Sequence, residues 1–571
     1  MHLSPDQKNA GVLAPVFALR SKNDLGVGDV AGLRAFVDWS ADIGIKVVQI
    51  LPINETGGDS SPYNAISSVA IDVTTIDTSP AAISELTPQA YKRVIEEYDL
   101  EALREGGVDY ANVKSLKHRL LAKAFTHFLE KERKSPSSRG KEFVRFREIE
   151  SEWLSPYAIF RVLMERNHTE QWNCWPAEHS TPESAAEWLK AQPAKVQKEF
   201  ETRVTYFKYV QWIAFSQWRA VKLHAESRGV ALMGDVPFGV SYFSSDVYSD
   251  RESFVLDWSG GAPPEPYFKD DEFTQKWGQN WGIPLYNWDI MQGNNFRWWR
   301  QRVRMVREIF HIFRIDHVLG CYRIYAFPWR PEENTDFLAL SHEEAAAKTG
   351  GRLPGFKPRD DSNPENCEAN RQEGEALLKV LLEETGEFRL VGEDLGMVPD
   401  YVRPNLASLG IAGFKIPIWE REWHEELVRG EHYQRLSLAT YGTHDHEPIR
   451  ALWERWHASI VANDEAANDA KADMHRLMRY ANLDTNHGWP ELTPEIHLAL
   501  LAALFRCNSW IASLMITDLF GSTVRFNVPG AVSTANWSNR LAIPVEDWKS
   551  DQKIGPLSLK VRDLLNETGR A

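Results

Sequence analysis

Three short segments of this sequence each carry an apolar, strand-like run into a cluster of ionisable residues. They are FRIDHVLG at 313–320, LVGEDLG at 390–396 and YGTHDHEP at 441–448. Asp316, Glu393 and Asp445 thus stand at the C-terminal ends of three expected strands. In a parallel barrel those ends meet on one face, where catalytic side chains lie. Two carboxylates with a third acid are the groups that cleave a glycosidic bond.

A basic residue accompanies the first of these acids. Arg314 precedes Asp316 by two residues, so both side chains point to the same side of a strand. A fixed positive charge beside a carboxylate favours its ionised form, which a nucleophile requires. The alternative is a buried ion pair that only stabilises the barrel. Three acidic strand ends in one chain favour the functional interpretation.

The second acid has an acidic neighbour. Glu393 is followed directly by Asp394, and a nearby carboxylate opposes ionisation. We therefore expect the pKa of Glu393 to be raised. A raised pKa suits a general acid that protonates a leaving oxygen and then acts as a base.

The histidines near these acids raise the alternative of a metal site. His444 and His446 flank Asp445, and His317 follows Asp316. Imidazole and carboxylate groups are ordinary ligands of divalent metals. Against this, the first expected strand lacks the His-x-His pair of barrel metallohydrolases, and the chain has no HExxH helix. We therefore expect no metal.

Two loop segments offer candidate substrate contacts. The range 257–288 holds four Gly, four Pro and four Trp, a composition that predicts an irregular active-site lid. Its tryptophans could line sugar subsites, although we expect two of them only to pack the loop onto the barrel. The four are Trp258, Trp277, Trp281 and Trp288. A turn at 57–68 presents Ser61 and Tyr63 beside the same face.

The elements that must position these residues follow from eight short apolar or β-branched runs. They are 11–19, 46–53, 230–238, 309–317, 388–396, 412–420, 436–445 and 510–521. Most are preceded by an amphipathic helix, most clearly at 30–45. Strand after helix, eight times, predicts the α/β class and a (β/α)₈ TIM barrel.

The expected barrel, a single catalytic domain over 1–571, is interrupted twice. A mainly helical subdomain is predicted at 54–229, between strands two and three. A second insertion at 329–385 carries Pro, Gly and acidic residues. We expect no β-sandwich domain after the eighth strand, because the tail from 522 is too short for one.

Composition excludes several classes of partner. The net charge of −15 argues against nucleic acid, which needs a basic face. The sequence contains no apolar run of 18 residues, and its start does not read as a signal peptide, so we expect no membrane association and a cytoplasmic protein. Four cysteines lie far apart, without CxxC spacing, and are expected to be reduced thiols. The 22 Trp favour a carbohydrate ligand.

The motifs FRIDH, GEDLG and THD, in this order, resemble those of the 4-α-glucanotransferases, or amylomaltases, of glycoside hydrolase family 77. Other segments are similar to the same family over about 11–545. They are 21–30, 49–56, 59–70, 234–240, 278–288 and 525–537. Two of these, 21–30 and 278–282, look closest to the maltose-using branch that includes plant cytosolic disproportionating enzymes.

The resemblance implies a retaining double displacement on α-1,4-glucans and maltooligosaccharides, without cofactor or metal. Asp316 would attack the anomeric carbon, Glu393 would act as acid and base, and Asp445 would stabilise the transition state. The acceptor would be the 4-hydroxyl of another glucan or of glucose. Further positions match residues that line the family's sugar subsites: Ser61, Tyr63, Asp235, Gln279, Trp281, Arg314, Asp394 and His444. The chain departs from the family pattern at 446–448, where His-Glu-Pro follows THD.

Two rival functions use the same features. An α-amylase-type hydrolase has the same three acids but resolves the intermediate with water. A non-catalytic glucan-binding scaffold would be favoured by loss of a catalytic acid, and all three acids are present. The family-specific segments favour transfer. Oligomeric state, donor length and the formation of cyclic products do not follow from the sequence.

Overall fold

The computed structural model describes residues 3–265, 271–486, 488–530, 533 and 535–571. Its main sheet has eight parallel strands in the order β10-β11-β12-β1-β2-β3-β6-β9. They are β1 (Asn9–Leu13), β2 (Val47–Gln49), β3 (Ala231–Val236), β6 (Ile312–Ile315), β9 (Leu390–Gly392), β10 (Gly413–Lys415), β11 (Ser437–Ala439) and β12 (Ile511–Met515). A parallel bridge between Val391 and Ala412 joins β9 to β10 and closes the barrel. The predicted (β/α)₈ barrel is confirmed: seven of the expected strands each contain one observed strand, and the expected strand at 11–19 overlaps β1, which begins two residues earlier.

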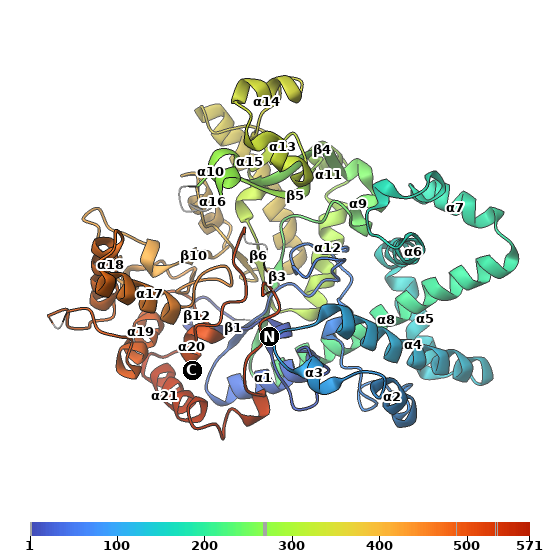
Figure 1. Ribbon diagram of the computed structural model, residues 1–571, viewed down its shortest axis with the longest axis horizontal. Coiled ribbons are helices and arrows are strands. Elements are labelled where there is room, and N and C mark those ends of the chain that lie inside the picture. The colour runs from blue at the N-terminus through green and yellow to red at the C-terminus, as the bar shows by residue number, and fades with distance from the viewer. Residues whose placement is uncertain (1–2, 266–270, 487, 531–532, 534) are drawn as a thin grey trace.

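Helices connect most of these strands along the outside (Figure 1). They are α1 (Val30–Asp42), α8 (Ala194–Ser227), α12 (Arg297–Ile309), α15 (Pro364–Thr385), α16 (Val402–Ser408), α17 (Ile449–Ala462), α18 (Ala467–Tyr480) and α19 (Pro494–Arg506). Between β10 and β11, where every residue is described, the helical segments are only the 3₁₀ turns η8 (Pro417–Trp419) and η9 (Gly430–His432). After β12 come α20 (Ile516–Phe520) and α21 (Ile554–Glu567). In the described residues, no helix is both long enough and apolar enough to cross a membrane.

The inside of the barrel changes from apolar to charged along the strands. Its apolar layer is one buried cluster drawn from every strand except β1: Val47, Ala231, Met233, Ile312, Val391, Ala412, Phe414, Leu438, Trp510 and Ile511. Side chains two residues apart on a strand share a face. Asp235 therefore follows Met233 on the inner face, Arg314 follows Ile312, and Glu393 follows Val391. Strand alternation alone thus lines the C-terminal mouth of the barrel with charge.

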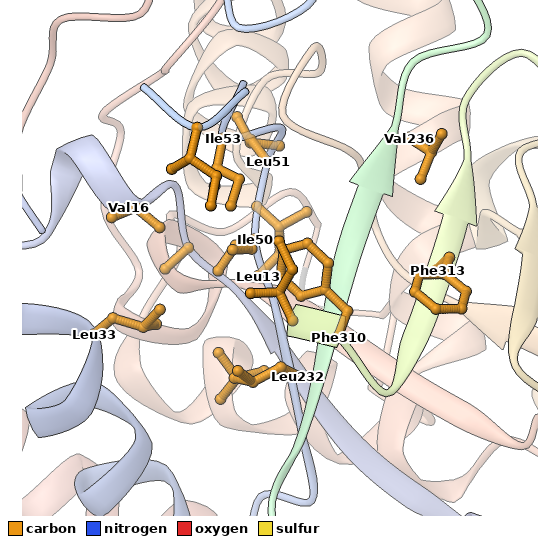
Figure 2. Packing of buried hydrophobic residues seen from close by; sticks show 14 of the residues in the cluster. Leu13, Val16, Leu33, Ile50, Leu51, Ile53, Leu232, Val236, Phe310 and Phe313 are labelled. Carbon is orange, nitrogen blue, oxygen red and sulfur yellow. The ribbon is translucent and has the colours of Figure 1, made fainter. Parts of the chain in front are cut away.

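The larger core lies between the strands and the helices that surround them. Figure 2 shows part of it, where Leu13, Leu232 and Phe310 pack together near Ile50. Close packing explains the glycine in β3. A Cβ atom at Gly234 would lie 2.3 Å from the ring of Phe310, so only glycine lets the end of α12 approach the strand this closely.

Most of the range 54–229 is helical, and in Figure 1 it forms a lobe beside the barrel. Besides α8 it contains α2 (Pro88–Ile95), α3 (Leu100–Arg104), α4 (Tyr110–Lys134), α5 (Ser138–Ile149), α6 (Ser151–Asn167) and α7 (Pro182–Ala191). A fully buried Lys117 on α4 ties the lobe to the barrel. Its Nζ lies 3.2 Å from Asp29 Oδ2 and donates to the carbonyl oxygens of Thr74 and Ile76.

The Gly- and Pro-rich range 257–288 contains regular structure where an irregular lid was expected. It holds most of β4 (Phe254–Ala262) and β5 (Gln279–Tyr286), which pair antiparallel. β7 (Ile324–Phe327) and β8 (Gly355–Lys357) complete a second, four-stranded sheet. The range 329–385 contributes β8, α13 (Asn334–Leu338), α14 (His342–Lys348) and α15. Figure 1 places the small sheet, with α13 and α14, above β3 and β6.

A buried arginine near the end of α21 gives a stability prediction. Arg570 donates to the carbonyl oxygens of Asn9, Phe505, Cys507 and Ser509. Arg570→Leu would leave these buried acceptors unpaired, so we expect a loss of about 2–4 kcal/mol in the free energy of unfolding. Thermal scanning should show a midpoint several degrees lower.

The matched control is Arg562→Leu, on α21 itself, where the side chain is 46% exposed. That change should shift the unfolding midpoint by a degree or so at most, since surface substitutions cost within about 0.5 kcal/mol. Equal midpoints for the two variants would show that Arg570 does not anchor the chain end.

Candidate active site

A buried arginine holds carboxylates together at the mouth of the barrel. Arg314 Nη1, on β6, lies 2.8 and 2.7 Å from the two oxygens of Asp235 and 2.8 Å from Asp316 Oδ1. Its Nη2 lies 4.0 Å from Glu393 Oε2. The side chain of Arg314 is only 4% exposed, whereas that of Asp316 is 26% exposed. Asp316 is thus the member of this group most open to an incoming ligand.

Glu393 is held at the end of β9 by backbone donors. Its Oε2 accepts a hydrogen bond of 2.9 Å from the His317 amide, and its Oε1 accepts one of 3.1 Å from the Leu395 amide. Burial raises the pKa of Glu393 to about 8, with Arg314 opposing the rise and the charge of Asp316 adding to it. The group is therefore mostly protonated at neutral pH. A proton donor within the same cluster as Asp316 is the arrangement that acid-assisted bond cleavage needs.

Asp394 faces the neighbouring strand. One oxygen accepts from Arg403 Nε at 2.9 Å, and the other accepts from the Phe414 amide on β10 at 2.6 Å. Its charge raises the pKa of Glu393 less than burial and Asp316 do. The expected rise in the pKa of Glu393 therefore comes mainly from burial, and the charge of Asp394 makes a smaller contribution. Alternation along the chain turns its side chain away while that of Glu393 points inward.

Asp445 lies in the loop after β11 and is fixed from two sides. Its Oδ2 is 3.3 Å from His444 Nε2, and its Oδ1 accepts a hydrogen bond of 2.6 Å from Asn527 Nδ2. Arg525 also donates to its backbone carbonyl. Burial alone would raise the pKa of Asp445, but His444 and Asn527 outweigh it and hold that pKa below its ordinary value. Asp445 is therefore kept ionised.

An aromatic stack links the two sides of this face. Tyr63 donates a hydrogen bond of 2.7 Å from its hydroxyl to Asp235 Oδ2. Its ring stacks on His444, with centroids 5.1 Å apart, and both rings contact Trp537 at 5.7 and 5.6 Å. Ser61 Oγ accepts from the Tyr63 amide and so shapes the turn that presents the tyrosine. The expected turn residues thus lie in the site, with Tyr63 in direct contact with its charged groups.

The small sheet contributes a second aromatic residue. Trp281, on β5, is 40% exposed, and its ring meets His317 edge-on at 4.9 Å. Gln279 Oε1 accepts from the Trp281 indole at 3.3 Å. Among the other tryptophans of 257–288, Trp277 is buried in a core cluster, and Trp258 and Trp288 are partly buried against the main core. Trp281 is therefore the tryptophan of this range that is free to contact a ligand.

Sequence reasoning missed three contributors: Asn527, Trp537 and the backbone of His317. His317 has φ of 43° and Trp537 has φ of 62°, values that are strained for bulky residues and that concentrate at functional sites. The only sequence signal for Asn527 and Trp537 was the family-like segment 525–537.

The histidines do not form a metal-binding group. Among the described residues, no set of three or more His, Cys, Asp and Glu side chains is arranged to hold a metal ion. His446 Nδ1 accepts from the Thr443 amide at 2.9 Å, and its ring contacts Trp419 at 4.9 Å. Burial lowers the pKa of both His317 and His446 to about 4, so these two residues are neutral at physiological pH.

The closed (β/α)₈ barrel, with an ionised acid, a protonated acid and aromatic walls at its C-terminal mouth, defines a class: the barrel enzymes that act on glycosidic bonds with carboxylates. Within that class, the model of the 4-α-glucanotransferase family, glycoside hydrolase family 77, matches residues 14–545. The chain belongs to this family. Its enzyme class is 4-α-glucanotransferase, and a hydrolase of the α-amylase type is not favoured.

Individual relatives agree with this assignment. The chain is 29% identical to a 4-α-glucanotransferase of Chlamydia pneumoniae over 549 residues, 95% of this chain and 93% of the relative. It is 33% identical to a 4-α-glucanotransferase of rice over 355 residues, 59% of this chain and 35% of the relative. The solved amylomaltase of Streptococcus agalactiae, in complex with acarbose, covers 99% of this chain and 100% of its own with a TM-score of 0.74. At 22% identity, that structure supports the fold.

Proposed function

We propose that the enzyme transfers α-1,4-glucan units by retaining double displacement, with Asp316 as nucleophile and Glu393 as acid and base. A carboxylate oxygen of Asp316 would bond to the anomeric carbon of the donor while the bond from that carbon to the glycosidic oxygen breaks. The proton of Glu393 would pass to the departing oxygen. In the second step Glu393 would take the proton of the acceptor 4-hydroxyl, whose oxygen displaces Asp316.

The observation that carries this proposal is the different environment of the two acids. Glu393 is buried and protonated at neutral pH, whereas Asp316 is partly exposed and touches the Arg314 guanidinium. Pairs of carboxyl groups in unlike environments are how glycosidases divide acid and nucleophile roles. Asp445, held ionised by His444 and Asn527, would stabilise positive charge that develops on the sugar ring.

We assign some of the surrounding residues to substrate contacts and the others to positioning of the site. Tyr63 and His444 would form one wall of the donor site, and Trp281 with Gln279 would form the other. Asp235 and Arg314 would hold the carboxylates in place, and Ser61 would position Tyr63. Asp394 would act through the β9–β10 packing, because its oxygens are occupied by Arg403 and Phe414. The lid role of 257–288 would fall to the β4–β5 hairpin.

We infer that the donors are maltooligosaccharides, with maltose among them, and that the protein is cytoplasmic. The likeness of segments 21–30 and 278–282 to the maltose-using branch supports the first inference. Cys174, Cys321, Cys367 and Cys507 are all free thiols, which supports the second.

Product analysis tests the activity directly. The purified enzyme is incubated with maltose, and separately with maltotriose, and every product is resolved by chain length. We expect glucose together with longer maltooligosaccharides, at a constant number of reducing ends. A rising number of reducing ends with only shorter products would show hydrolysis instead, and no change with either sugar would refute these donors.

Asn527 gives a test of the Asp445 assignment. Asn527→Asp replaces the donor by a second carboxylate, so it removes the hydrogen bond and adds repulsion, both of which raise the pKa of Asp445. We expect kcat/KM for maltotriose to fall about 10–100-fold, with the acidic limb of its pH profile moved upward. Asn527→Ala should lower kcat/KM less and shift that limb by a smaller amount. A limb that stays in place in both variants would contradict a need for ionised Asp445.

A further inference from the structure

A buried carboxyl that the mechanism does not use lies beside the loop 440–448, which carries Asp445 and is called the Asp445 loop below. Asp518, on α20, is 1% exposed, and its Oδ1 accepts a hydrogen bond of 2.7 Å from the Ile449 amide. Its Oδ2 is buried and has no hydrogen-bond partner in the described part of the chain. Burial raises the pKa of Asp518 to about 7, and the Ile449 amide opposes only part of the rise. An unpaired buried oxygen destabilises the fold, so stability alone does not account for a carboxyl at this position.

The Ile449 amide begins the helix that follows the Asp445 loop. α17 starts at Ile449 directly after Pro448, and a proline side chain has no oxygen with which to cap a helix. The first amides of a helix have no partner within it and need an acceptor from elsewhere. Asp518 supplies one from 69 positions away in the sequence. It thereby fixes the start of α17, which lies a few residues after Asp445.

The segment after β12 also holds the Asp445 loop at other points. Asp445 accepts one hydrogen bond at its carbonyl oxygen from Arg525 and one at its carboxylate from Asn527. At the start of α17, Arg450 Nε donates to the carbonyl oxygen of Gly521. Because α20 follows β12 directly, all these contacts tie the loop to one strand of the barrel. The loop is therefore held both at Asp445 and at the helix that follows it.

We propose that Asp518 is a positioning residue of the catalytic centre, which holds the Asp445 loop, through the Ile449 amide, where Asp445 meets the sugar. It touches neither the substrate nor the reacting atoms and acts only through that loop. The link between them is short, and Pro448 fixes one of its φ angles. A misplacement of about 1 Å at a catalytic group costs up to about 100-fold in rate. The inference rests on the proposed role of Asp445, and the variants that follow separate the two.

The kinetics of Asp518→Ala on maltotriose test the proposal. The substitution removes the acceptor, so we expect kcat to fall about 10–100-fold with little change in KM, since Asp445 acts on the transition state. The acidic limb of the kcat/KM profile should move upward, because the contacts that keep Asp445 ionised are loosened. Asp518→Asn keeps a carbonyl oxygen for the Ile449 amide and should restore most of kcat. Equal losses in the two variants would contradict a role as acceptor for that amide.

A matched control removes a helix cap elsewhere in the chain. Thr181 Oγ1 caps α7, in the helical lobe, where it accepts from the Ser184 amide at 3.1 Å. Thr181→Ala should lower the thermal midpoint of unfolding by a few degrees and leave both kcat and the acidic limb unchanged. If Asp518→Ala does not fold, Ile449→Pro removes the same hydrogen bond from the donor side. Proline is favoured at the first position of a helix, so α17 should persist, and the same loss of kcat is expected.

An Asp445→Asn background shows whether Asp518 acts through Asp445. In that background Asp518→Ala should lower the residual kcat by less than about twofold, because the group that it positions is already disabled. An undiminished loss there, or wild-type kcat in Asp518→Ala alone, would overturn the inference and leave the role of Asp445 intact. Wild-type kcat in Asp445→Asn would instead refute the proposed role of Asp445, and the inference with it.

Discussion

Asp316→Asn is expected to lower the rate of transfer from maltotriose by at least about 10⁴-fold, the scale of loss when a covalent nucleophile is removed. The amide has almost the same volume as the carboxylate but cannot attack the anomeric carbon. Arg314 keeps its two contacts with Asp235, so the barrel should fold as before. Product analysis measures the rate, and the thermal midpoint measures the fold.

A control separates loss of the nucleophile from loss of any aspartate charge. Asp336→Asn removes a carboxylate that is 61% exposed and pairs with Lys348 at the surface, so it should leave transfer unchanged. Trapping adds a positive readout. A fluorinated glucosyl fluoride should label the wild-type peptide that contains Asp316 and leave Asp316→Asn unlabelled. Substantial turnover in Asp316→Asn, or a label on another residue, would refute the assignment of the nucleophile.

The barrel strands could be predicted because each is a short run that is apolar on both faces and ends in a turn or charged cluster. The strands of the small sheet could not be predicted. Its strand β4 contains Gly260 and Gly261, which are typical of loops in a sequence. In the structure these glycines permit close contact between strands. A Cβ atom at Gly261 would lie 1.8 Å from the carbonyl oxygen of Gln279 on β5. The two glycines therefore indicate close packing between strands and not an irregular loop.

Site residues could be predicted where they lie two positions apart on one strand, as Arg314 and Asp316 do. Contacts between distant segments could not be predicted. Asn527 reaches Asp445 across 82 positions of sequence, and no local pattern marks it as a partner. The direction in which the Asp394 side chain points could not be predicted from the sequence either. Adjacent residues at a strand end point to opposite sides, and only the position of β10 shows which side is which.

The helical lobe helps to shape the active site, although it carries none of the catalytic acids. Lys114, on α4, donates to the carbonyl oxygen of Thr56 at 2.8 Å and so holds the segment that leads to Tyr63. Tyr110, at the start of the same helix, donates a hydrogen bond of 2.6 Å to the carbonyl oxygen of Trp537. One inserted helix thus holds two segments whose rings meet above Asp235, which explains how Trp537 keeps a strained backbone.

Glu393→Gln is expected to lower transfer from maltotriose by about 10²–10⁴-fold, the usual contribution of a general acid and base. The glutamine keeps the shape, and its single carbonyl oxygen can still accept from one of the two amides, those of His317 and Leu395, that bond to Glu393. It cannot deliver a proton to the leaving oxygen. An α-glucosyl fluoride donor needs no such proton, so its first step should stay near the wild-type rate in single-turnover measurements. An equal loss with both donors would contradict the role of Glu393 as the acid.

The pH profile gives the same residue a second, independent signature. Because the pKa of Glu393 is raised to about 8, the protonated form that starts the reaction is lost above that pH, and kcat/KM of the wild type should fall there. Folding stability should follow the same group. Between its ordinary value of 4.5 and about 8 the folded state binds more protons than the unfolded state, so stability falls as pH rises through this window. Glu393→Gln cannot titrate at this position, so its residual activity should lose the basic limb. Its free energy of unfolding should increase relative to that of the wild type as pH rises through that window. A basic limb that persists in the variant would assign it to another group.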